Sequence, residues 1–467
     1  MSAARTVLQN FFNLSAGELV ARLVNFAAFA HLARVLGSTD FGHVGFLMTV
    51  TSYLLIPVMQ GFDSVGVRDV ARDRGRVRQY AGSILSIRLL SASFTWTAAA
   101  VAVALLQPAP PMGLLALVFA LALFPNAVSL KWVFQAVEET RPVAAASIAA
   151  QIAFAAGAFT ISGPQQLVLV PVYSIIGESA GALVLIGAFA RRFGPLRPIF
   201  HRPLWKELFR ESAPLAASTI LGTLLFNFDV LALAKFQTQA AVGLYTAIYK
   251  LVLLFATLLT LFQLSLFPLL SRAYADNREL RPVAGRVLHF VAAAFVPLAF
   301  AGTLLARPLL EFFFGPEYAA GGATLQILLW SLPVMALRSV FRIILVSYNL
   351  QRLDMLAVLA GALANISLDI VLAPRLSTVG TAISTLASEL TILALCYRYV
   401  WKRIEPIGIG RHCLRPAAAS LVMLAAGSAM TQAPLPAQAA AAGFVYLAVL
   451  LLLRGLNWKE IAALYRG

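Results

Sequence analysis

The sequence predicts an all-α polytopic membrane protein with about 14 transmembrane helices, and three observations support this fold class. Hydrophobic residues make up 60% of the 467 residues, charged residues make up only 12%, and the mean hydropathy is +0.83. Apolar residues occur in blocks of about 20, the length that crosses a bilayer as a helix. In hydrocarbon the backbone must hydrogen-bond to itself, so these blocks have to be helices, and no alternating segments typical of membrane strands are present.

Hydropathy places the predicted spans near residues 12–33, 41–62, 82–106, 112–135, 143–163, 167–190, 213–234, 243–270, 287–306, 323–347, 355–373, 379–398, 414–431 and 437–453. The first apolar run carries one early arginine, Arg5, and no small-residue cleavage site follows it. We therefore expect an uncleaved first span rather than a signal peptide.

The distribution of lysine and arginine predicts the orientation of these spans, because cytoplasmic segments carry an excess of both. With a cytoplasmic N-terminus, 27 of the 36 lysines and arginines fall in cytoplasmic segments, and four (Arg34, Lys235, Arg307 and Arg375) fall in outside loops. This frame predicts that both termini face the cytoplasm. The formal charge of +16 is then explained by basic residues in the cytoplasmic segments that orient the spans, and not by a nucleic-acid-binding domain.

The longest polar stretch divides the chain into two groups of spans. We expect an N-terminal six-helix lobe at 1–190, a cytoplasmic linker at 191–212, a C-terminal six-helix lobe at 213–400, and two additional transmembrane helices with a cytoplasmic tail at 401–467. The two halves contain a weak internal repeat with an offset of 201 residues. The pairs Ala33-Arg34 and Gly42-His43 in the first half correspond to Ala234-Lys235 and Gly243-Leu244 in the second. Six spans separate the copies, so the repeat is predicted to be parallel, with its axis along the membrane normal.

Several motifs along the chain carry a family resemblance. They are Ala33-Arg-Val-Leu-Gly-Ser-Thr-Asp-Phe-Gly-His-Val-Gly-Phe46, Val67-Arg-Asp-Val-Ala-Arg72, Asn227-Phe-Asp229 with Val242-Gly-Leu-Tyr245, Leu266-Phe-Pro-Leu-Leu-Ser271, and Asn365-Ile-Ser-Leu-Asp-Ile-Val-Leu-Ala-Pro374 running into Gly380-Thr-Ala-Ile-Ser-Thr385. In order and spacing they resemble Wzx-type polysaccharide flippases of the multidrug/oligosaccharidyl-lipid/polysaccharide exporter superfamily. The resemblance covers nearly the whole chain and departs at Ala373 and Arg375, where the family usually has isoleucine and lysine.

The resemblance implies two six-helix lobes in a parallel pseudo-two-fold arrangement around a central cavity, plus two C-terminal helices. It implies alternating access that moves undecaprenyl-pyrophosphate-linked oligosaccharide repeat units to the outer leaflet of the cytoplasmic (inner) membrane, for O-antigen or exopolysaccharide biosynthesis. The expected partners are the lipid-linked oligosaccharide, membrane lipid, and a polysaccharide polymerase and chain-length regulator, with no nucleic acid. No cofactor is expected. The driving force stays open between protons, sodium, chloride and the membrane potential, with proton or sodium coupling considered for the acids inside the spans.

Polar and ionisable residues inside the spans independently predict a polar interior. A charge at a helix centre costs about 2.5–3.5 kcal/mol on insertion scales, so such residues usually face a bundle interior or a water-filled cavity. In the first span Glu18, Arg22 and Asn25 share one helical face, as do Ser331, Arg338, Arg342 and Asn349 in the tenth span. The predicted substrate-binding residues are Arg22, Asn25, Lys250, Arg338, Arg342 and Asn349. The predicted ion-coupling or gating residues are Glu18, Glu178, Asp229 and Asp369.

Structural alternatives exist for several of these residues. Glu18 and Arg22 also fit an intrahelical ion pair, and Asp369 also fits a bond to neighbouring helices. Arg88, near the cytoplasmic end of the third span, can snorkel towards the interface, and a structural role is preferred for it. Arg338 and Arg342 have no acid one turn away, so we expect an unpaired cationic face with a functional role.

Small residues and cysteines are interpreted structurally. Gly177 and Gly181 form a GxxxG pattern, which is typical of close helix packing in membranes. Cys396 and Cys413 are too few for a disulfide framework or a metal site, so both are expected to be free thiols.

Three function classes remain to be compared. A flippase for lipid-linked oligosaccharides needs cations inside the membrane, and the basic excess of Arg22, Lys250, Arg338 and Arg342 favours such an anionic substrate. A cation-coupled multidrug antiporter of the same fold would need acids in its cavity instead. A membrane polysaccharide polymerase or ligase needs a large outside loop or a soluble catalytic domain, whereas the longest outside loop, 307–322, contains no histidine. We therefore expect a transporter and not an enzyme.

Overall fold

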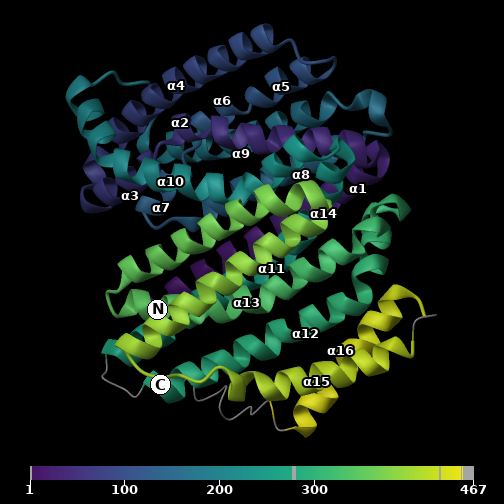
Figure 1. Cartoon of the computed structure of the whole chain (residues 1–467). Helices are drawn as coiled ribbons and strands as arrows, with labels where there is room; N and C mark the ends of the chain where they lie inside the picture. Colours follow the sequence, from purple (N-terminus) through teal and green to yellow (C-terminus); the bar gives the residue numbers. More distant parts are fainter. Residues whose placement is uncertain (1–2, 276–279, 431–432, 454, 456–467) are drawn as a thin grey trace. The chain divides into compact units, whose positions relative to one another are not determined.

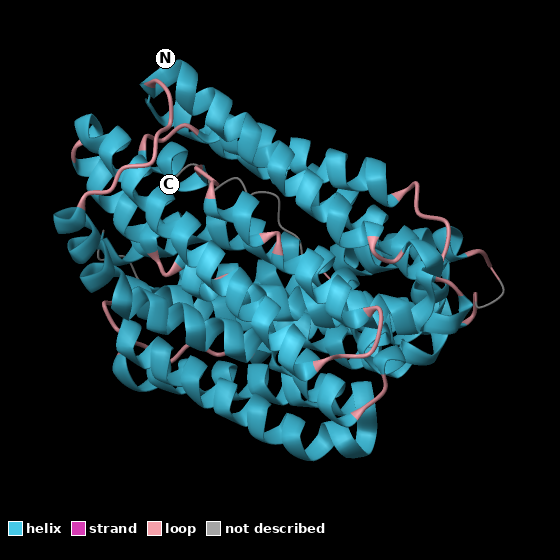
Figure 2. Ribbon diagram, turned by 90° about the horizontal axis from the view of Figure 1, so that it is seen from above, coloured by secondary structure: helices cyan, strands magenta, loops and turns pink. Residues whose placement is uncertain are grey.

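The computed structural model describes residues 3–275, 280–430, 433–453 and 455, and these form helices joined by short connections (Figures 1 and 2). Side chains are described for the same residues except 3–18, 217–218, 220–221, 224–226, 261 and 264–275. The helices are α1 (Ala3–Leu54), α2 (Ile56–Met59), α3 (Phe62–Arg72), α4 (Val77–Leu106), α5 (Met112–Ala120), α6 (Leu123–Ala127), α7 (Lys131–Ala136), α8 (Thr140–Ala158), α9 (Leu169–Phe193), α10 (Arg202–Phe236), α11 (Gln239–Ala275), α12 (Leu280–Phe314), α13 (Gly322–Ser347), α14 (Gln351–Arg403), α15 (Gly410–Ser428) and α16 (Leu435–Leu452). Short 3₁₀ turns lie at Arg74–Arg76, Pro164–Gln166 and Pro316–Gly321.

The predicted all-α membrane fold is confirmed. No strand occurs among the described residues, and nine stretches of them are long and apolar enough to cross a membrane. Two of these stretches hold two predicted spans each, because the backbone breaks at Gly37 (φ 75°) in α1 and at Ser377 (φ 52°) in α14. The remaining predicted spans correspond to α8, α10 and α15.

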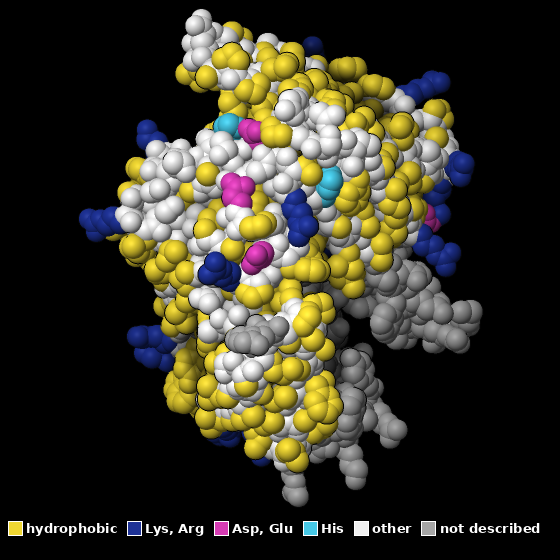
Figure 3. Space-filling model, turned by 90° about the vertical axis from the view of Figure 1, so that its right-hand side faces the viewer, with side chains coloured by type: hydrophobic (Ala, Val, Ile, Leu, Met, Phe, Trp, Pro, Cys, Tyr) yellow, Lys and Arg dark blue, Asp and Glu magenta, His cyan; other side chains and the backbone are white. Residues whose placement is uncertain are grey.

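The surface of the described chain agrees with a lipid environment. Large apolar side chains are widely exposed, for example Phe94 at 77%, Leu105 at 78% and Leu452 at 81%. The face shown in Figure 3 is largely hydrophobic, with only scattered charged side chains. In water such a surface would aggregate, so the chain is a multi-pass membrane protein.

The chain separates into two compact units, which are described separately. The first comprises Met1–Ala234 and Thr238–Thr246, and the second comprises Lys235–Gln237 and Ala247–Gly467. Helix α10 was expected to open the C-terminal lobe, but by its contacts it belongs almost entirely to the first unit. Grouping by contacts does not test the lobe boundaries expected from the sequence, so these boundaries stay a prediction.

The stretch 191–212 does more than connect two lobes, contrary to the expectation of a plain linker. The backbone nitrogen of Ile199 donates to the carbonyl oxygen of Gly82 in α4 at 3.1 Å. Leu204 and Leu208, in the first turns of α10, are buried in the core that also contains Trp132. These apolar residues attach the segment to the core of the first unit, although its many arginines and prolines suggest a linker without tertiary contacts.

Arg88 in α4 has the structural role that the sequence favoured, but its side chain is buried and does not snorkel to the interface. Its side chain is 1% exposed, and it donates to Asp63 of α3 at 2.7 Å. Helix α3 follows Gly61 (φ 74°) and packs its apolar face on α4 and α7. This packing places Asp63 next to the buried arginine. Because Arg88 thereby has a charge partner within the protein, its side chain does not have to reach the interface.

Two close helix contacts organise the first unit. The GxxxG prediction is confirmed, because a Cβ atom on Gly177 of α9 would lie 2.6 Å from the carbonyl oxygen of Ala150 in α8. The glycines of the internal repeat also meet: a Cβ atom on Gly42 of α1 would lie 3.0 Å from the backbone nitrogen of Gly243 in α11. The repeat predicted from the sequence thus marks a backbone contact.

The second unit is a sequence of helix pairs. Helix α12 packs against α13, α13 packs against α14, and α15 and α16 pack on α12. The hydroxyl of Tyr446 in α16 donates to the carbonyl oxygen of Ala293 in α12 at 2.6 Å. At Ser377, α14 turns back on itself, so that Ser388 donates to the carbonyl oxygen of Gly361 at 2.8 Å. Both cysteines are free thiols, as expected.

Candidate functional site

Arg338 is held between two helices of the second unit. It lies in the middle of α13, and its Nε is 2.7 Å from Oε2 of Glu389 in the second segment of α14. Both side chains are 14% exposed, so this ion pair is largely removed from solvent. The pairing was not expected, because no acid lies one turn from Arg338 on its own helix.

Arg342, one turn further along α13, has a different environment. Its Nε donates to Oδ2 of Asp354 in the first turn of α14 at 3.1 Å, while the arginine side chain remains 53% exposed. Oδ1 of the same aspartate lies 4.0 Å from the Sγ of Cys396. The expectation of an unpaired cationic face was therefore wrong: each arginine has a carboxylate partner, and both partners come from α14.

Asn349 does not extend the polar face of α13. The helix ends at Ser347, and Asn349 is exposed with φ 58°. The backbone nitrogen of Leu350 donates to Leu345 at 2.8 Å, and that of Asn349 donates to Val346 at 3.1 Å. This is a Schellman cap, in which asparagine tolerates the left-handed backbone, so the helical face predicted for Asn349 does not exist.

The polar face of α1 is only partly described. Arg22 is exposed, and Nδ2 of Asn25 donates to Oε1 of Gln151 in α8 at 2.6 Å. The side chain of Glu18 lies outside the described residues, so an ion pair with Arg22 is not described. Asn25 joins α1 to α8 within the first unit.

The predicted coupling residues lie in separate environments. In the first unit Asp229 is 6% exposed and accepts a hydrogen bond from the hydroxyl of Tyr245. Glu178 of α9 accepts from Nδ2 of Asn126 at 2.5 Å. In the second unit the side chain of Asp369 in α14 is fully buried. Lys250 of α11, which was predicted to bind substrate, also belongs to this unit, and its side chain is half-buried. Arg338 and Arg342, with their partners Glu389 and Asp354, all lie within electrostatic range of Cys396.

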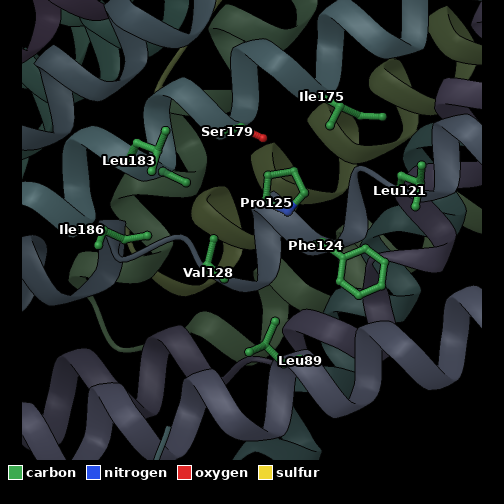
Figure 4. A pocket seen from close by; sticks show the side chains of 10 residues that line it. Leu89, Leu121, Phe124, Pro125, Val128, Ile175, Ser179, Leu183 and Ile186 are labelled. Carbon is green, nitrogen blue, oxygen red and sulfur yellow. The ribbon is translucent and has the colours of Figure 1, made fainter. Parts of the chain in front are cut away.

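An apolar cavity of about 490 Å³ lies elsewhere, in the first unit (Figure 4). It is lined by Leu89 of α4, by residues of and around α6, and by one side of α9, and Ser179 contributes a hydroxyl to an otherwise apolar lining. None of the predicted site residues lines it, although Glu178 and Asn126 are sequence neighbours of lining residues. Among the described residues, no group of three or more His, Cys, Asp or Glu is placed to hold a metal ion.

Sequence reasoning missed the carboxylate partners of the arginines, although a signal was present. Arg342 and Asp354 lie six residues before and six residues after Tyr348, in the turn between α13 and α14. Two helices joined by a short turn run antiparallel, so residues at equal distance from the turn meet. The break at Ser377 likewise makes the two segments of α14 run antiparallel and pack against each other.

Comparison with known proteins identifies the family. The model of the family described as Polysaccharide biosynthesis protein matches residues 7–274, more than half of the chain. The chain belongs to this family. A second family model, MatE, matches residues 214–371.

A relative of this polysaccharide biosynthesis protein is the Lipid II flippase MurJ of Bacillus subtilis (strain 168), with 24% identity over 252 residues. The match covers 50% of this chain and 44% of the relative, so it spans less than half of the relative's length.

Two solved structures share the fold. The Lipid II flippase MurJ in an inward closed conformation has a TM-score of 0.78 at 14% identity, covering 94% of this chain and 98% of that chain. An inward-facing multidrug resistance MATE family transporter of the MOP superfamily has a TM-score of 0.66 at 11% identity, covering 83% and 98%. The fold is therefore that of MurJ and the MATE transporters.

Proposed function

We propose that the protein is a flippase that moves undecaprenyl-pyrophosphate-linked oligosaccharide repeat units from the inner to the outer leaflet of the cytoplasmic membrane. Membership of the polysaccharide biosynthesis family supports this proposal, as does the likeness to a protein named as a lipid II flippase. Alternating access supplies the movement, both termini face the cytoplasm, and a polysaccharide polymerase and a chain-length regulator act on the product.

The observation that carries the proposal is the position of Arg338 and Arg342 on one face of α13, inside a membrane helix. A pyrophosphate cannot cross hydrocarbon bare, since an isolated ion faces a Born cost of tens of kcal/mol. Arginine meets this need better than lysine, because its planar fork binds two phosphate oxygens and stays charged. Arg22, Asn25 and Lys250 are further substrate contacts in this proposal.

Complementation of a flippase-deleted strain tests the proposal. Arg338→Ala with Arg342→Ala should abolish surface polysaccharide while the protein stays inserted at normal abundance on a membrane blot. Lysine at both positions should restore it only in part, since the charge returns without the fork. Arg307→Ala, which removes an exposed arginine from α12, is the matched control and should retain full activity.

A cation-coupled multidrug antiporter is the second candidate, favoured by the MatE match and by the buried acids Asp229 and Asp369. In both candidates these acids, with Glu18 and Glu178, are the proposed groups for coupling to protons or sodium. Loss of drug resistance with normal surface polysaccharide in a deletion strain would select the antiporter. The relatives are transporters by name, which disfavours the polymerase or ligase alternative.

A further inference from the structure

Two arginines of α13 and two carboxylates of α14 form a four-charge cluster in the second unit. The described pairs are Arg338 with Glu389 at 2.7 Å and Arg342 with Asp354 at 3.1 Å. With both acids ionised, the cluster has no net charge. A pyrophosphate carries about two negative charges at neutral pH, so two arginines already neutralised by carboxylates would gain little from binding it. A site for this anion must therefore displace at least one of its internal carboxylates.

The two carboxylates differ in what stabilises them when an arginine leaves. Asp354 lies in the first turn of α14, where free backbone N–H groups and the helix dipole favour a negative charge. Glu389 lies in the middle of the second segment of α14, far from either helix end. Among the described residues, no hydrogen-bond donor other than the ion-paired Arg338 approaches Oε2 of Glu389.

Building on the proposed function, we propose that Glu389 is an exchangeable counter-ion that occupies Arg338 in the unloaded protein and takes up a proton when a lipid pyrophosphate displaces it. Glu389 is a positioning residue in this scheme, because it acts on the substrate through Arg338. Asp354 keeps its charge in both states and holds Arg342 at the open side of the cluster.

The exchange balances in charge and in protons. The Arg338–Glu389 contact breaks, a contact between the Arg338 guanidinium and a phosphate oxygen forms, and one proton from water converts the Glu389 carboxylate to the neutral acid. Without that proton the carboxylate would be left buried and ionised, which is costly inside a membrane helix. Release reverses each step: the proton leaves, Glu389 recaptures Arg338, and the phosphate is expelled. One proton is thus bound for each substrate bound.

The surroundings of Glu389 contain few other titratable groups. Arg338 faces it from α13. Cys396 lies two turns along its own segment, and Arg338, Arg342, Asp354 and Glu389 all lie within electrostatic range of that thiol. The other helix that packs on α13 is α12, and its His289 is hydrogen-bonded to the backbone carbonyls of His412 and Gly455 instead. In this scheme, Glu389 is the group among the described residues that gains the proton when the substrate binds.

Binding of undecaprenyl pyrophosphate to the full-length protein in nanodiscs tests the exchange, with undecaprenol as the control lipid that lacks the anion. Glu389→Gln mimics the neutral acid, so it should bind undecaprenyl pyrophosphate about tenfold more tightly than the wild type at neutral pH. As the pH falls, the wild-type affinity should rise towards that of the variant, and the gap between them should close. Asp354→Asn, the matched control, should leave this pH dependence in place.

A second measurement counts the proton directly. Calorimetric titration of the wild type with undecaprenyl pyrophosphate, in two buffers of different ionisation enthalpy, should report uptake of about one proton per lipid. The same titration of Glu389→Gln should report uptake near zero.

Three results would overturn the exchange: equal or weaker binding by Glu389→Gln, a gap that does not change with pH, or no proton uptake by the wild type. A structural role for Glu389 predicts weaker binding and lower abundance, the opposite of the expected gain. If neither protein prefers undecaprenyl pyrophosphate to undecaprenol, the proposed function fails as well. Preference for the pyrophosphate without proton uptake refutes the exchange alone.

Discussion

Gly42 of α1 and Gly243 of α11 lie so close together that neither has room for a side chain. A Cβ atom on Gly42 would lie 3.0 Å from the backbone nitrogen of Gly243, and one on Gly243 would lie 2.8 Å from that of Gly42. Each added atom would also overlap a carbonyl oxygen of the facing helix, that of Gln239 or of Ser38. The clash is with backbone, which a rotamer change cannot relieve.

Substituting alanine at either glycine should therefore destabilise the protein. We expect Gly42→Ala and Gly243→Ala each to cost about 1–3 kcal/mol or more, the usual range for overpacking. Thermal unfolding of the purified protein in detergent measures this cost. Gly187→Ala is the matched control, because a Cβ atom there meets nothing within 4 Å, and it should be neutral or slightly stabilising. Equal stability of Gly42→Ala and Gly187→Ala would contradict the contact.

The buried pair of Arg88 and Asp63 predicts a strong coupling. Asp63→Ala leaves an arginine that is 1% exposed without its carboxylate, and breaking such a pair costs about 3–5 kcal/mol. The double variant Asp63→Ala with Arg88→Met removes the stranded charge and should recover much of that loss. Asp73→Asn is the control, because it removes an exposed charge but keeps the side-chain oxygen that accepts from the backbone nitrogen of Gly75. A double-mutant cycle with no coupling energy would show that the pair is not formed.

Asp69 of α3, outside the membrane spans, predicts a pH dependence. Burial raises the pKa of its carboxyl, but hydrogen bonds from Arg68 and Tyr80 and the charge of nearby Arg72 offset this, leaving the pKa below its ordinary 3.8. A lowered pKa stabilises the fold above the ordinary value, and this stabilisation is lost as the pH falls through the folded-state value.

The pH dependence is tested with Asp69→Asn. The variant should be less stable than the wild type by about 0.2–1 kcal/mol at neutral pH, as for a partly exposed pair. The difference should shrink as the pH falls below 3.8. Unfolding curves across that range measure it, and a difference that grows in acid would have the wrong sign.

The segment 191–212 should tolerate changes of charge order but not of its apolar anchors. Its basic residues are exposed: Arg191, Arg192, Arg197, Arg202, Lys206 and Arg210. Rearranging these at constant charge should preserve transport, whereas Leu204→Asp or Leu208→Asp buries an unpaired charge and should strongly reduce abundance. Membrane-fraction blots compare the two classes of variant, and normal abundance of Leu208→Asp would argue against the packing.

The sequence was sufficient for features governed by local patterns. Span positions and the GxxxG contact at Gly177 follow from hydropathy and spacing, because these depend on nearest-neighbour geometry. The repeat of Gly42 at Gly243 was visible in the sequence, but their contact was not predicted. The ends of elements were less predictable. The end of α13 at Ser347 removed Asn349 from its expected face, and the buried leucines of α10 were hidden among prolines and arginines.

Charge pairing was the least predictable part of the site. No acid lies one turn from Arg338 or Arg342 on its own helix, and the partners of Arg338, Arg342 and Arg88 all come from another helix. Such pairs depend on which helices pack together and in what register. For Arg342 and Asp354 the short turn between α13 and α14 fixes that register. For Arg88 and Asp63 it depends on how α3 folds back after Gly61.

The central claim is that Arg338 and Arg342 carry the pyrophosphate of a lipid-linked oligosaccharide, and translocation in proteoliposomes tests it most directly. Purified wild-type protein should move undecaprenyl-pyrophosphate-linked oligosaccharide to the opposite leaflet, and Arg307→Ala should do the same. The Arg338→Ala/Arg342→Ala variant, reconstituted at equal density, should fall to the level of protein-free vesicles. Translocation by that double variant at the wild-type rate would contradict the claim.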